Sequence, residues 1–162
     1  MNAGYAEDHH WVHEDGGRII GEGCHIIDLM TSFTNEKIVS ISFESLKPDN
    51  SKFISSDNKS IILKYEDGSV ANIQYFATGA KTLSKEYMEL HFDNKSIIMD
   101  DYKSINGYGI RINKINASVS QKGHLEQLIA FYNSIVGKST SWPIELWDMI
   151  QTTEATFQVS KI

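Results

Sequence analysis

The sequence has a single cysteine, Cys24, and only two prolines among its 162 residues. One cysteine cannot form a disulfide within the chain, so a hydrophobic core has to hold the fold, and this usage fits a reducing compartment. No run approaches the roughly 18 apolar residues of a membrane-spanning helix, and no basic segment followed by an apolar one opens the chain. We therefore expect a cytoplasmic protein.

Positive charge is also scarce. The chain has 15 Lys and Arg residues against 21 Asp and Glu residues, a formal net charge of −6. This balance argues against nucleic acid or an anionic membrane surface as a partner. A hydrophobic content of 41% and a charged content of 22% are ordinary for a globular protein. The length fits one domain, so we expect residues 1–162 to form a single unit.

Hydrophobic periodicity predicts the elements. Alternation of apolar and polar residues predicts strands at 37–45, 60–66, 69–77, 86–92, 96–100 and 108–113. Asp67-Gly68 predicts a hairpin turn between two of these strands. Helical spacing predicts a helix that ends near Thr34, and two more at 124–136 and 144–157. The order predicts an α+β fold, an open and mostly antiparallel sheet with helices packed on one face.

The predicted strands also suggest how the two faces of the sheet differ. In residues 37–45, Val39, Ile41 and Phe43 should face the helices. The other face is more polar but carries several apolar residues, and we expect them to form a partly dry patch at a subunit contact. These residues are Ile38, Ile62, Val70, Phe76 and Tyr87.

Residues 16–29 carry the most distinctive chemistry. On a helix with about 100° per residue, Arg18, Glu22, His25 and Leu29 form one stripe. The opposite stripe has apolar side chains and one glycine, and consists of Ile19, Gly23, Ile26, Ile27 and Met30. A guanidinium, a carboxylate and an imidazole in one line are suited to holding a polar substrate. We therefore expect the functional site on this helix.

Each residue of this stripe also has a structural alternative. His25 could act as a general acid or base tuned by Glu22, or it could only hydrogen-bond a neighbour. Arg18 and Glu22 could form an i, i+4 surface pair. Asp28 could cap or pair near a loop. Cys24 points about 100° away from His25 on a helix and has no support as a nucleophile.

Other polar patterns carry less weight. Lys81 and Lys85 precede a predicted strand and could reach an anionic group or be solvated. Residues 8–13 hold three histidines and an aspartate, but a polar arm is a poor platform for a rigid metal site, so we expect no metal. The glycines of residues 16–23 fail as a phosphate-binding loop because no apolar strand precedes them.

The segment Gly16-Gly17-x-x-x-Gly21-Glu22-Gly23-Cys24-His25-x-x-Asp28-Leu29 resembles the core of the second domain in the glucose–fructose oxidoreductase / inositol dehydrogenase / MocA (Gfo/Idh/MocA) family. Further features that are similar to this family follow in the same order, and the resemblance covers nearly the whole chain. They are Tyr65-Glu66-Asp67-Gly68-Ser69, Lys85-Glu86-Tyr87, Gln121-Lys122-Gly123-His124, Trp142-Pro143-Ile144 and Ala155-Thr156-Phe157.

The resemblance implies that this chain is half of an enzyme. Members of the family have a first, Rossmann domain that binds NAD or NADP and carries a catalytic lysine in a Glu-Lys-Pro motif, and this motif does not occur here. The chain is similar to the second, C-terminal domain, which supplies substrate contacts and the subunit-packing sheet. NAD or NADP would be bound mainly by the missing domain, so no cofactor is expected in this chain.

The resemblance also implies roles for single residues. His25 matches the catalytic or substrate-orienting histidine of a sugar or polyol dehydrogenase. Many members place an aspartate four residues before it, where this chain has Gly21, so either Glu22 substitutes or this branch lacks the acid. We expect the isolated chain to be inactive. The other residues expected to contact substrate are Arg18, Glu22, Lys81, Lys85 and Tyr75.

The expected partners are the Rossmann domain of the same parent protein, a sugar or polyol substrate, and further copies in a homodimer or tetramer formed through the sheet face. Two other functions are compatible with the sequence. One is a stand-alone, non-enzymatic α+β module for binding or dimerisation. The other is a small cone-shaped α+β enzyme with a histidine–acid dyad in a deep pocket.

Overall fold

The computed structural model describes residues 1–3, 17–47 and 55–161. They fall into two compact units, one formed by Met1–Ala80 with Ile144–Ile162 and the other by Lys81–Pro143. Both units have antiparallel sheets and helices, so the predicted α+β class is confirmed. None of the described helices combines the length and the apolar character needed to cross a membrane.

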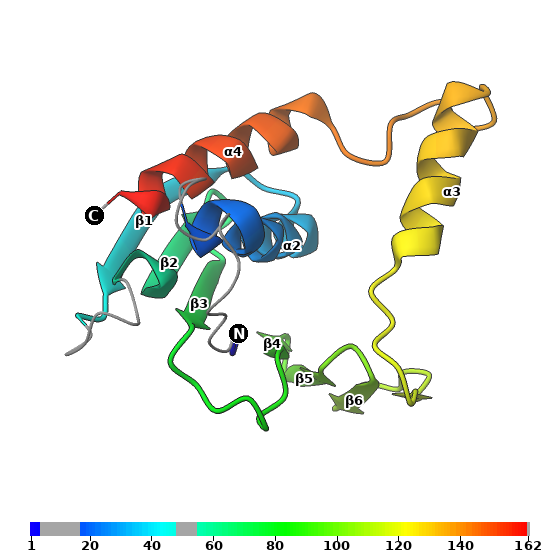
Figure 1. Ribbon diagram of the computed structural model, residues 1–162. Helices are drawn as coiled ribbons and strands as arrows, with labels where there is room; N and C mark the ends of the chain where they lie inside the picture. The colour runs from blue at the N-terminus through cyan, green and yellow to red at the C-terminus, as the bar shows by residue number, and fades with distance from the viewer. Residues whose placement is uncertain (4–16, 48–54, 162) are drawn as a thin grey trace. The chain divides into compact units, whose positions relative to one another are not determined.

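In the first unit, two helices cover one face of a three-stranded sheet with the order β1-β2-β3 (Figure 1). A short π-helical turn, η1, leads directly into α2, and a 3-10 turn, η2, precedes β2. The elements are η1 (Ile19–Gly23), α2 (Cys24–Thr34), β1 (Ile38–Ser45), η2 (Ser55–Asp57), β2 (Asn58–Tyr65), β3 (Val70–Phe76) and α4 (Leu146–Ser160).

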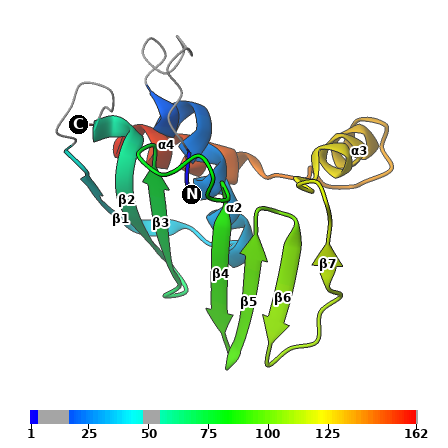
Figure 2. The same cartoon turned by 60° about the horizontal axis from the view of Figure 1, so that its bottom comes forward.

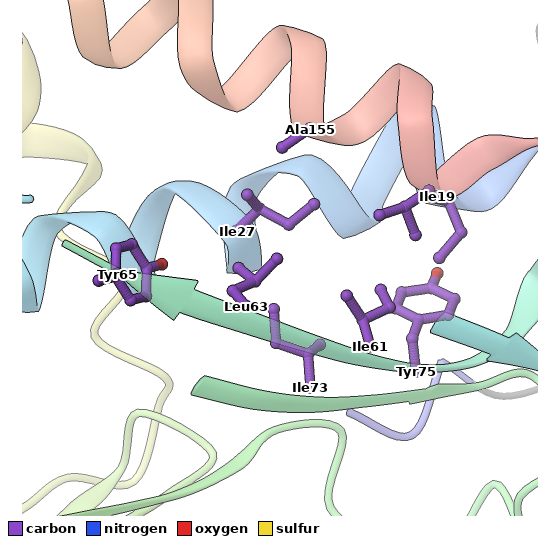
Figure 3. Packing of buried hydrophobic residues seen from close by; sticks show 9 residues of the cluster. Ile19, Ile27, Ile61, Leu63, Tyr65, Ile73, Tyr75 and Ala155 are labelled. Carbon is purple, nitrogen blue, oxygen red and sulfur yellow. The ribbon is translucent and has the colours of Figure 1, made fainter. Parts of the chain in front are cut away.

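The core of this unit lies between the helices and the sheet (Figure 3). Alternate residues of β2 point into it, as the strand pattern predicts, and α2 and α4 contribute from above. The buried members are Ile19, Ile27, Ile61, Leu63, Tyr65, Ile73, Tyr75, Ala155 and Val159. The β2–β3 hairpin predicted from Asp67-Gly68 is confirmed, with Gly68 in the left-handed region at φ 91°.

Strand β1 corrects one prediction about faces. Its register against β2 shifts between Ile38 and Ser40, so a β-bulge lies at Val39. Because a bulge inserts one extra residue, the inward and outward alternation reverses there. Ile38 packs against the core, whereas Val39 is 56% exposed. Both assignments from the sequence were therefore wrong, while Ile41 and Phe43 do pack against the core as predicted.

A buried lysine ties the end of α4 to the sheet. Lys59, in β2, is fully buried, and its Nζ donates to the carbonyl oxygens of Val159 at 2.6 Å and Lys161 at 2.8 Å. These carbonyls belong to the last turn of α4 and the residue after it, where helix carbonyls lack partners within the helix. The same ammonium lies 4.7 Å from the ring centre of Phe43. Lys59 thereby fixes the position of α4 over β1 and β2.

The second unit contains a four-stranded antiparallel sheet with the order β4-β5-β6-β7 (Figure 2). The chain then forms α3 (His124–Ile135), which has no buried residue and ends before Gly137 at φ 71°. The strands are β4 (Tyr87–Phe92), β5 (Lys95–Asp100), β6 (Ser104–Tyr108) and β7 (Ile115–Asn116).

The sequence predicted one sheet, but the described strands pair as two sheets of three and four strands. The predicted strand at 108–113 is also wrong, because β6 ends at Tyr108 and a bend follows it. Gly109 has φ 68°, and a side-chain carbon at this position would lie 2.7 Å from the carbonyl oxygen of Asn94. The chain therefore turns at Gly109, within the segment that hydrophobic alternation predicted to be a strand.

Candidate functional site

The predicted functional helix begins with a turn that is wider than an α-helical turn. Residues Ile19–Gly23 form a π-helix, and the N–H of Cys24 bonds to the carbonyl of Ile19, five residues earlier. A π turn holds more residues than an α turn, so each residue advances by less than the α-helical angle. Residues 18 and 25, which would lie on one side of a regular helix, therefore diverge. Such turns are frequent at functional sites.

The apolar stripe predicted for this helix is confirmed by burial. Ile19, Gly23 and Ile27 are buried, and Ile26 and Met30 are half-buried against the core. The polar stripe is divided. Arg18 is 5% exposed, Glu22 is half-buried, and His25 is exposed.

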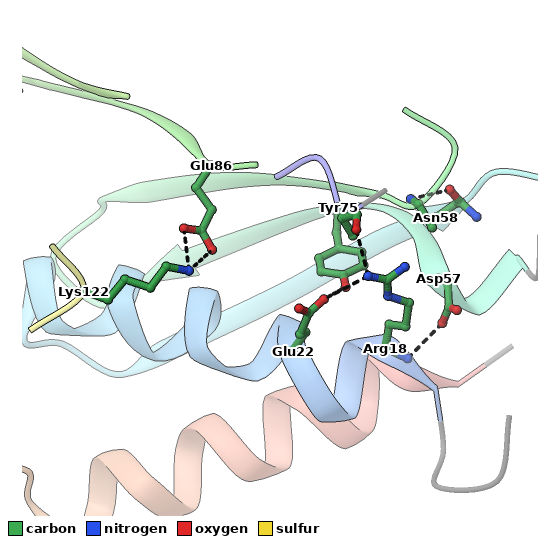
Figure 4. Close-up of polar contacts among 9 residues, drawn as sticks. Arg18, Glu22, Asp57, Asn58, Tyr75, Glu86 and Lys122 are labelled. Carbon is green, nitrogen blue, oxygen red and sulfur yellow. Dashed lines mark hydrogen bonds and ion pairs between the residues drawn. The ribbon is translucent and has the colours of Figure 1, made fainter. Parts of the chain in front are cut away.

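Arg18, Glu22 and Tyr75 form a hydrogen-bonded cluster between η1 and β3 (Figure 4). The hydroxyl of Tyr75 donates to Oε2 of Glu22 at 2.5 Å, and Nη2 of Arg18 lies 3.3 Å from the same oxygen. Nη2 of Arg18 also donates to the carbonyl of Ala3 at 2.9 Å. The guanidinium predicted to contact substrate is thus engaged with protein groups.

Tyr75 is buried, and its environment keeps the hydroxyl protonated. Burial raises the pKa of Tyr75 well above its ordinary value, and the hydrogen bond to the carboxylate of Glu22 raises it further. The nearby guanidinium of Arg18 opposes this effect but is weaker. Tyr75 therefore acts as a hydrogen-bond donor to Glu22 at neutral pH.

The turn before η1 is anchored to the start of β2. The backbone N–H of Arg18 donates to Oδ1 of Asp57 at 2.9 Å, and Asp57 is buried. Gly17 has φ 84°, which is unfavourable for residues with a side chain, and an added Cβ would lie 3.1 Å from that same Oδ1. These contacts hold the first residue of the functional helix against the sheet.

His25 lies one turn further along, on the exposed side of α2. Asp28 follows it at i+3 and is half-buried. Burial raises the pKa of the Asp28 carboxyl above its ordinary value, and the charge of His25 opposes this by favouring the carboxylate. Residues three apart on a helix are neighbours. Asp28 is therefore an acid that interacts electrostatically with His25. From the sequence we predicted only a capping or pairing role for Asp28, although the His-x-x-Asp spacing indicates this interaction.

A second carboxyl lies near Asp28 on the neighbouring helix. Burial raises the pKa of Asp148, in the first turn of α4, and the charge of Asp28 raises it further. The hydroxyl of Thr152 donates to Oδ1 of Asp148 at 3.4 Å, which favours the ionised form. Two acids and an imidazole therefore interact electrostatically where α2 packs against α4.

Lys81 and Lys85 both belong to the second unit, Lys81 exposed and Lys85 half-buried. The next residue, Glu86, is 3% exposed, and both of its carboxylate oxygens lie 3.0 Å from Nζ of Lys122 (Figure 4). This pair joins the start of β4 to the segment before α3. It fixes the backbone next to Lys85.

The histidines at positions 9, 10 and 13 and the aspartate at 8 lie outside the described residues. Within the described ranges, no group of three metal-ligating side chains occurs. Cys24 is half-buried, and burial raises the pKa of its thiol, which disfavours the nucleophilic thiolate.

The glycines at the start of the helix were also tested as a cradle for a dinucleotide. A Cβ on Gly23 would lie 3.2 Å from Cδ1 of Ile19, and one on Gly17 would meet Asp57. Both glycines therefore make room for protein atoms. Neither exposes backbone to a phosphate as a dinucleotide-binding loop does.

Solved structures show the same fold at low sequence identity. A UDP-N-acetylglucosamine 3-dehydrogenase from Acidithiobacillus ferrooxidans matches with a TM-score of 0.73 and 15% identity, covering 98% of this chain and 49% of its own. A biliverdin reductase from Synechocystis, solved with biliverdin and NADP+, matches with a TM-score of 0.63 and 14% identity, covering 98% and 52%. An NAD-binding protein from Listeria innocua matches with a TM-score of 0.53 and 17% identity, covering 98% and 47%.

The chain thus spans about half the length of the solved structures it matches. No curated protein sequence matches it. Residues 4–156 match the family described as "Oxidoreductase family, C-terminal alpha/beta domain". This match extends over most of the sequence, and the chain therefore belongs to the Gfo/Idh/MocA oxidoreductase family as its C-terminal α/β domain.

Proposed function

We propose that this chain is the substrate-contacting half of an NAD(P)-dependent oxidoreductase that acts on a sugar or polyol, with His25 at the reacting hydroxyl. The observation that carries the proposal is the exposed His25, which interacts electrostatically with the half-buried Asp28 three residues later, on a helix fixed at its start by the Arg18–Glu22–Tyr75 cluster. An imidazole held beside a carboxylate is suited to proton transfer near neutral pH.

In this proposal the chain's own residues handle the proton and the substrate's orientation. The imidazole of His25 takes the proton of the substrate hydroxyl during oxidation and returns it during reduction. Asp28 is a positioning residue, because its carboxylate favours the imidazolium that forms. Glu22 is half-buried beside the helix start and is a candidate to accept a hydrogen bond from another substrate hydroxyl.

Arg18 fits a positioning role better than the predicted substrate contact. Its side chain is 6% exposed and holds Glu22 and the carbonyl of Ala3. Lys81 and Lys85 remain predicted contacts to an anionic group of the substrate. Their role depends on a substrate that carries such a group.

The cofactor in this proposal is NAD or NADP, which would supply the hydride acceptor or donor. Gly17 and Gly23 make room for protein atoms rather than for its phosphates, so in this proposal the Rossmann domain of the same parent protein would bind it. The exposed helix α3 supports such a domain partner, because an amphipathic helix without buried residues needs an apolar surface to cover it. Its exposed apolar residues include Leu125, Leu128, Ile129, Tyr132 and Ile135.

The test uses the complete protein, in which we expect the coding region to join this chain to a strand–Gly-x-Gly-x-x-Gly–helix segment. We expect His25→Asn to lower kcat by about 10² to 10⁴ with little change in substrate KM. We expect Asp28→Asn to shift the pH profile of kcat. The matched control is His91→Asn, an exposed histidine on β4, which should leave kcat unchanged.

Two results would contradict the proposal. One is turnover of a sugar with NADH or NADPH by the 162-residue chain alone, because this would show that no second domain is needed. The other is wild-type kcat in the His25→Asn variant. An upstream coding region without a nucleotide-binding segment would favour the stand-alone binding module instead.

We also propose that copies of the chain associate as a homodimer or tetramer through the open sheet face. Ile62 and Val70 support this for the first unit, because they are 45% and 63% exposed on the face opposite the helices. Replacing both with lysine should convert the oligomer to monomer in sedimentation experiments. Val119→Lys, at another exposed apolar position, is the control. A wild-type chain that sediments as a monomer at every concentration would refute the association.

A further inference from the structure

A groove of about 420 Å³ lies between the outer edge of β1 and helix α4, within the first unit. Residues 37–41 line it from the side of β1, and Trp147, Ile150 and Glu154 are among the residues of α4 that line it. The groove is separate from the candidate site, because none of His25, Asp28 and Glu22 lines it. Its lining combines apolar side chains such as Trp147 and Ile150 with the charged side chains of Lys37 and Glu154.

The edge of β1 along this groove offers main-chain hydrogen-bonding groups. The N–H of Leu46 bonds to the carbonyl of Asn58 in β2, and the register from Ser40 to Ser45 is continuous. In an antiparallel pair, main-chain groups alternate between the two sides. Those of Ile41 and Phe43 therefore point away from β2. Within the described ranges no strand pairs with this side of β1.

One amide group already binds at this edge in the manner of a neighbouring strand. Oε1 of Gln151 accepts from the N–H of Ile38 at 2.8 Å, and its Nε2 donates to the carbonyl of Glu36 at 3.3 Å. A carboxamide that bonds one N–H and one C=O two residues apart makes the same two contacts as the N–H and C=O of one residue in a parallel neighbouring strand. The outer edge of β1 thus already binds one amide group through its main chain.

We propose that this groove binds an extended peptide segment of another protein, which adds to β1 as an edge strand. Main-chain bonds to Ile41 and Phe43 continue the pattern that Gln151 begins. Alternate side chains of the peptide face α4, so an apolar one contacts Trp147 and Ile150. A basic one pairs with Glu154. This chemistry is independent of the oxidoreductase activity.

The experiment measures fluorescence anisotropy of a labelled peptide, acetyl-Thr-Val-Thr-Val-Thr-Lys-Thr-amide, with the full 162-residue chain. We expect saturable binding. Two further versions of the peptide carry backbone N-methyl groups. One has them on the threonines and the other on the valines and the lysine, so each version lacks the N–H groups along one edge of the extended peptide. Only one version should bind at least tenfold more weakly, because two or more hydrogen bonds are lost.

Variants of the chain locate the peptide. Trp147→Ala should weaken binding at least fivefold, while Trp142→Ala, in the second unit, should not change it. Hydrogen exchange supplies a readout that does not depend on a variant, since bound peptide should slow exchange of the Ile41 and Phe43 amides. Absence of saturable binding at 1 mM peptide, equal loss or equal retention in both N-methylated versions, or self-association of the chain through β1 would each overturn the proposal.

Discussion

The hydroxyl of Tyr75 and the carboxylate of Glu22 are joined by a 2.5 Å hydrogen bond between β3 and the π turn η1. Tyr75 is fully buried, whereas Glu22 retains some exposure. The bond therefore connects the core of the first unit to the start of the helix that carries His25. A change at Tyr75 should be felt both in stability and in the position of that helix.

We expect Tyr75→Phe to lower the free energy of unfolding by about 2 kcal/mol, because a charged acceptor loses a buried donor. Urea unfolding at pH 8 measures this. The matched control is Tyr87→Phe, since Tyr87 also donates to a carboxylate, Glu89 at 2.6 Å, but on an exposed face. Equal effects of the two changes would show that burial of the Tyr75–Glu22 bond is unimportant.

Tyr75 also predicts a dependence on alkaline pH. Its pKa is raised in the folded chain, so the unfolded chain releases this proton first as the pH rises above about 10. The contribution of Tyr75 to the free energy of unfolding is complete below that pH. Above it this contribution falls by about 1.4 kcal/mol per pH unit. The stability difference between wild type and Tyr75→Phe should therefore shrink between pH 9 and pH 11, as measured by urea unfolding. A constant difference would contradict the raised pKa.

We expect Lys59→Met to destabilise the chain by about 3 kcal/mol, because it removes a charged donor from two carbonyls at the end of α4. The loss should be visible in chemical unfolding. The control is Lys64→Met, an exposed lysine of the same strand, which should have little effect. If both variants unfold alike, the anchoring of α4 by Lys59 is refuted.

Asp28→Asn should stabilise the chain at pH 7 while impairing catalysis in the complete protein. The pKa of Asp28 is raised in the folded chain, so its stabilising contribution exists below about pH 4 and is lost as the pH rises. Thermal unfolding at pH 7 and pH 3 should show a gain only at pH 7. Asp67→Asn is the control with the opposite sign, because hydrogen bonds from Ser69 lower the pKa of Asp67. A loss of stability for Asp28→Asn at pH 7 would contradict this account.

The sequence predicted those features that depend on neighbours along the chain. Strand alternation in β2 placed Ile61, Leu63 and Tyr65 in the core, and Asp67-Gly68 marked the hairpin. The left-handed Asn35 ends α2 where the pattern of the helix stops. These features follow from side-chain periodicity and turn chemistry, which are local properties.

The candidate site was predicted only in part. The apolar stripe of the functional helix was correct, and His25 is exposed as a substrate contact has to be. The polar stripe was drawn on a regular helix, so the π turn that carries Arg18 and Glu22 toward Tyr75 was missed. Nothing in the residues themselves indicates the wider turn. Arg18, at the start of this turn, is held by contacts outside the helix, with the carbonyl of Ala3 and the carboxylate of Asp57.

The amino-acid sequence by itself determined the α+β class, the hairpin and the apolar stripe of the functional helix, because each depends on spacing within a few residues. Only the tertiary structure decided the bulge at Val39, the division of the strands into two sheets, and the burial of Arg18 with Tyr75. These depend on which distant segments pair, and a pairing that shifts by one residue exchanges the inside and outside of a strand. The same pairing leaves one edge of β1 beside α4.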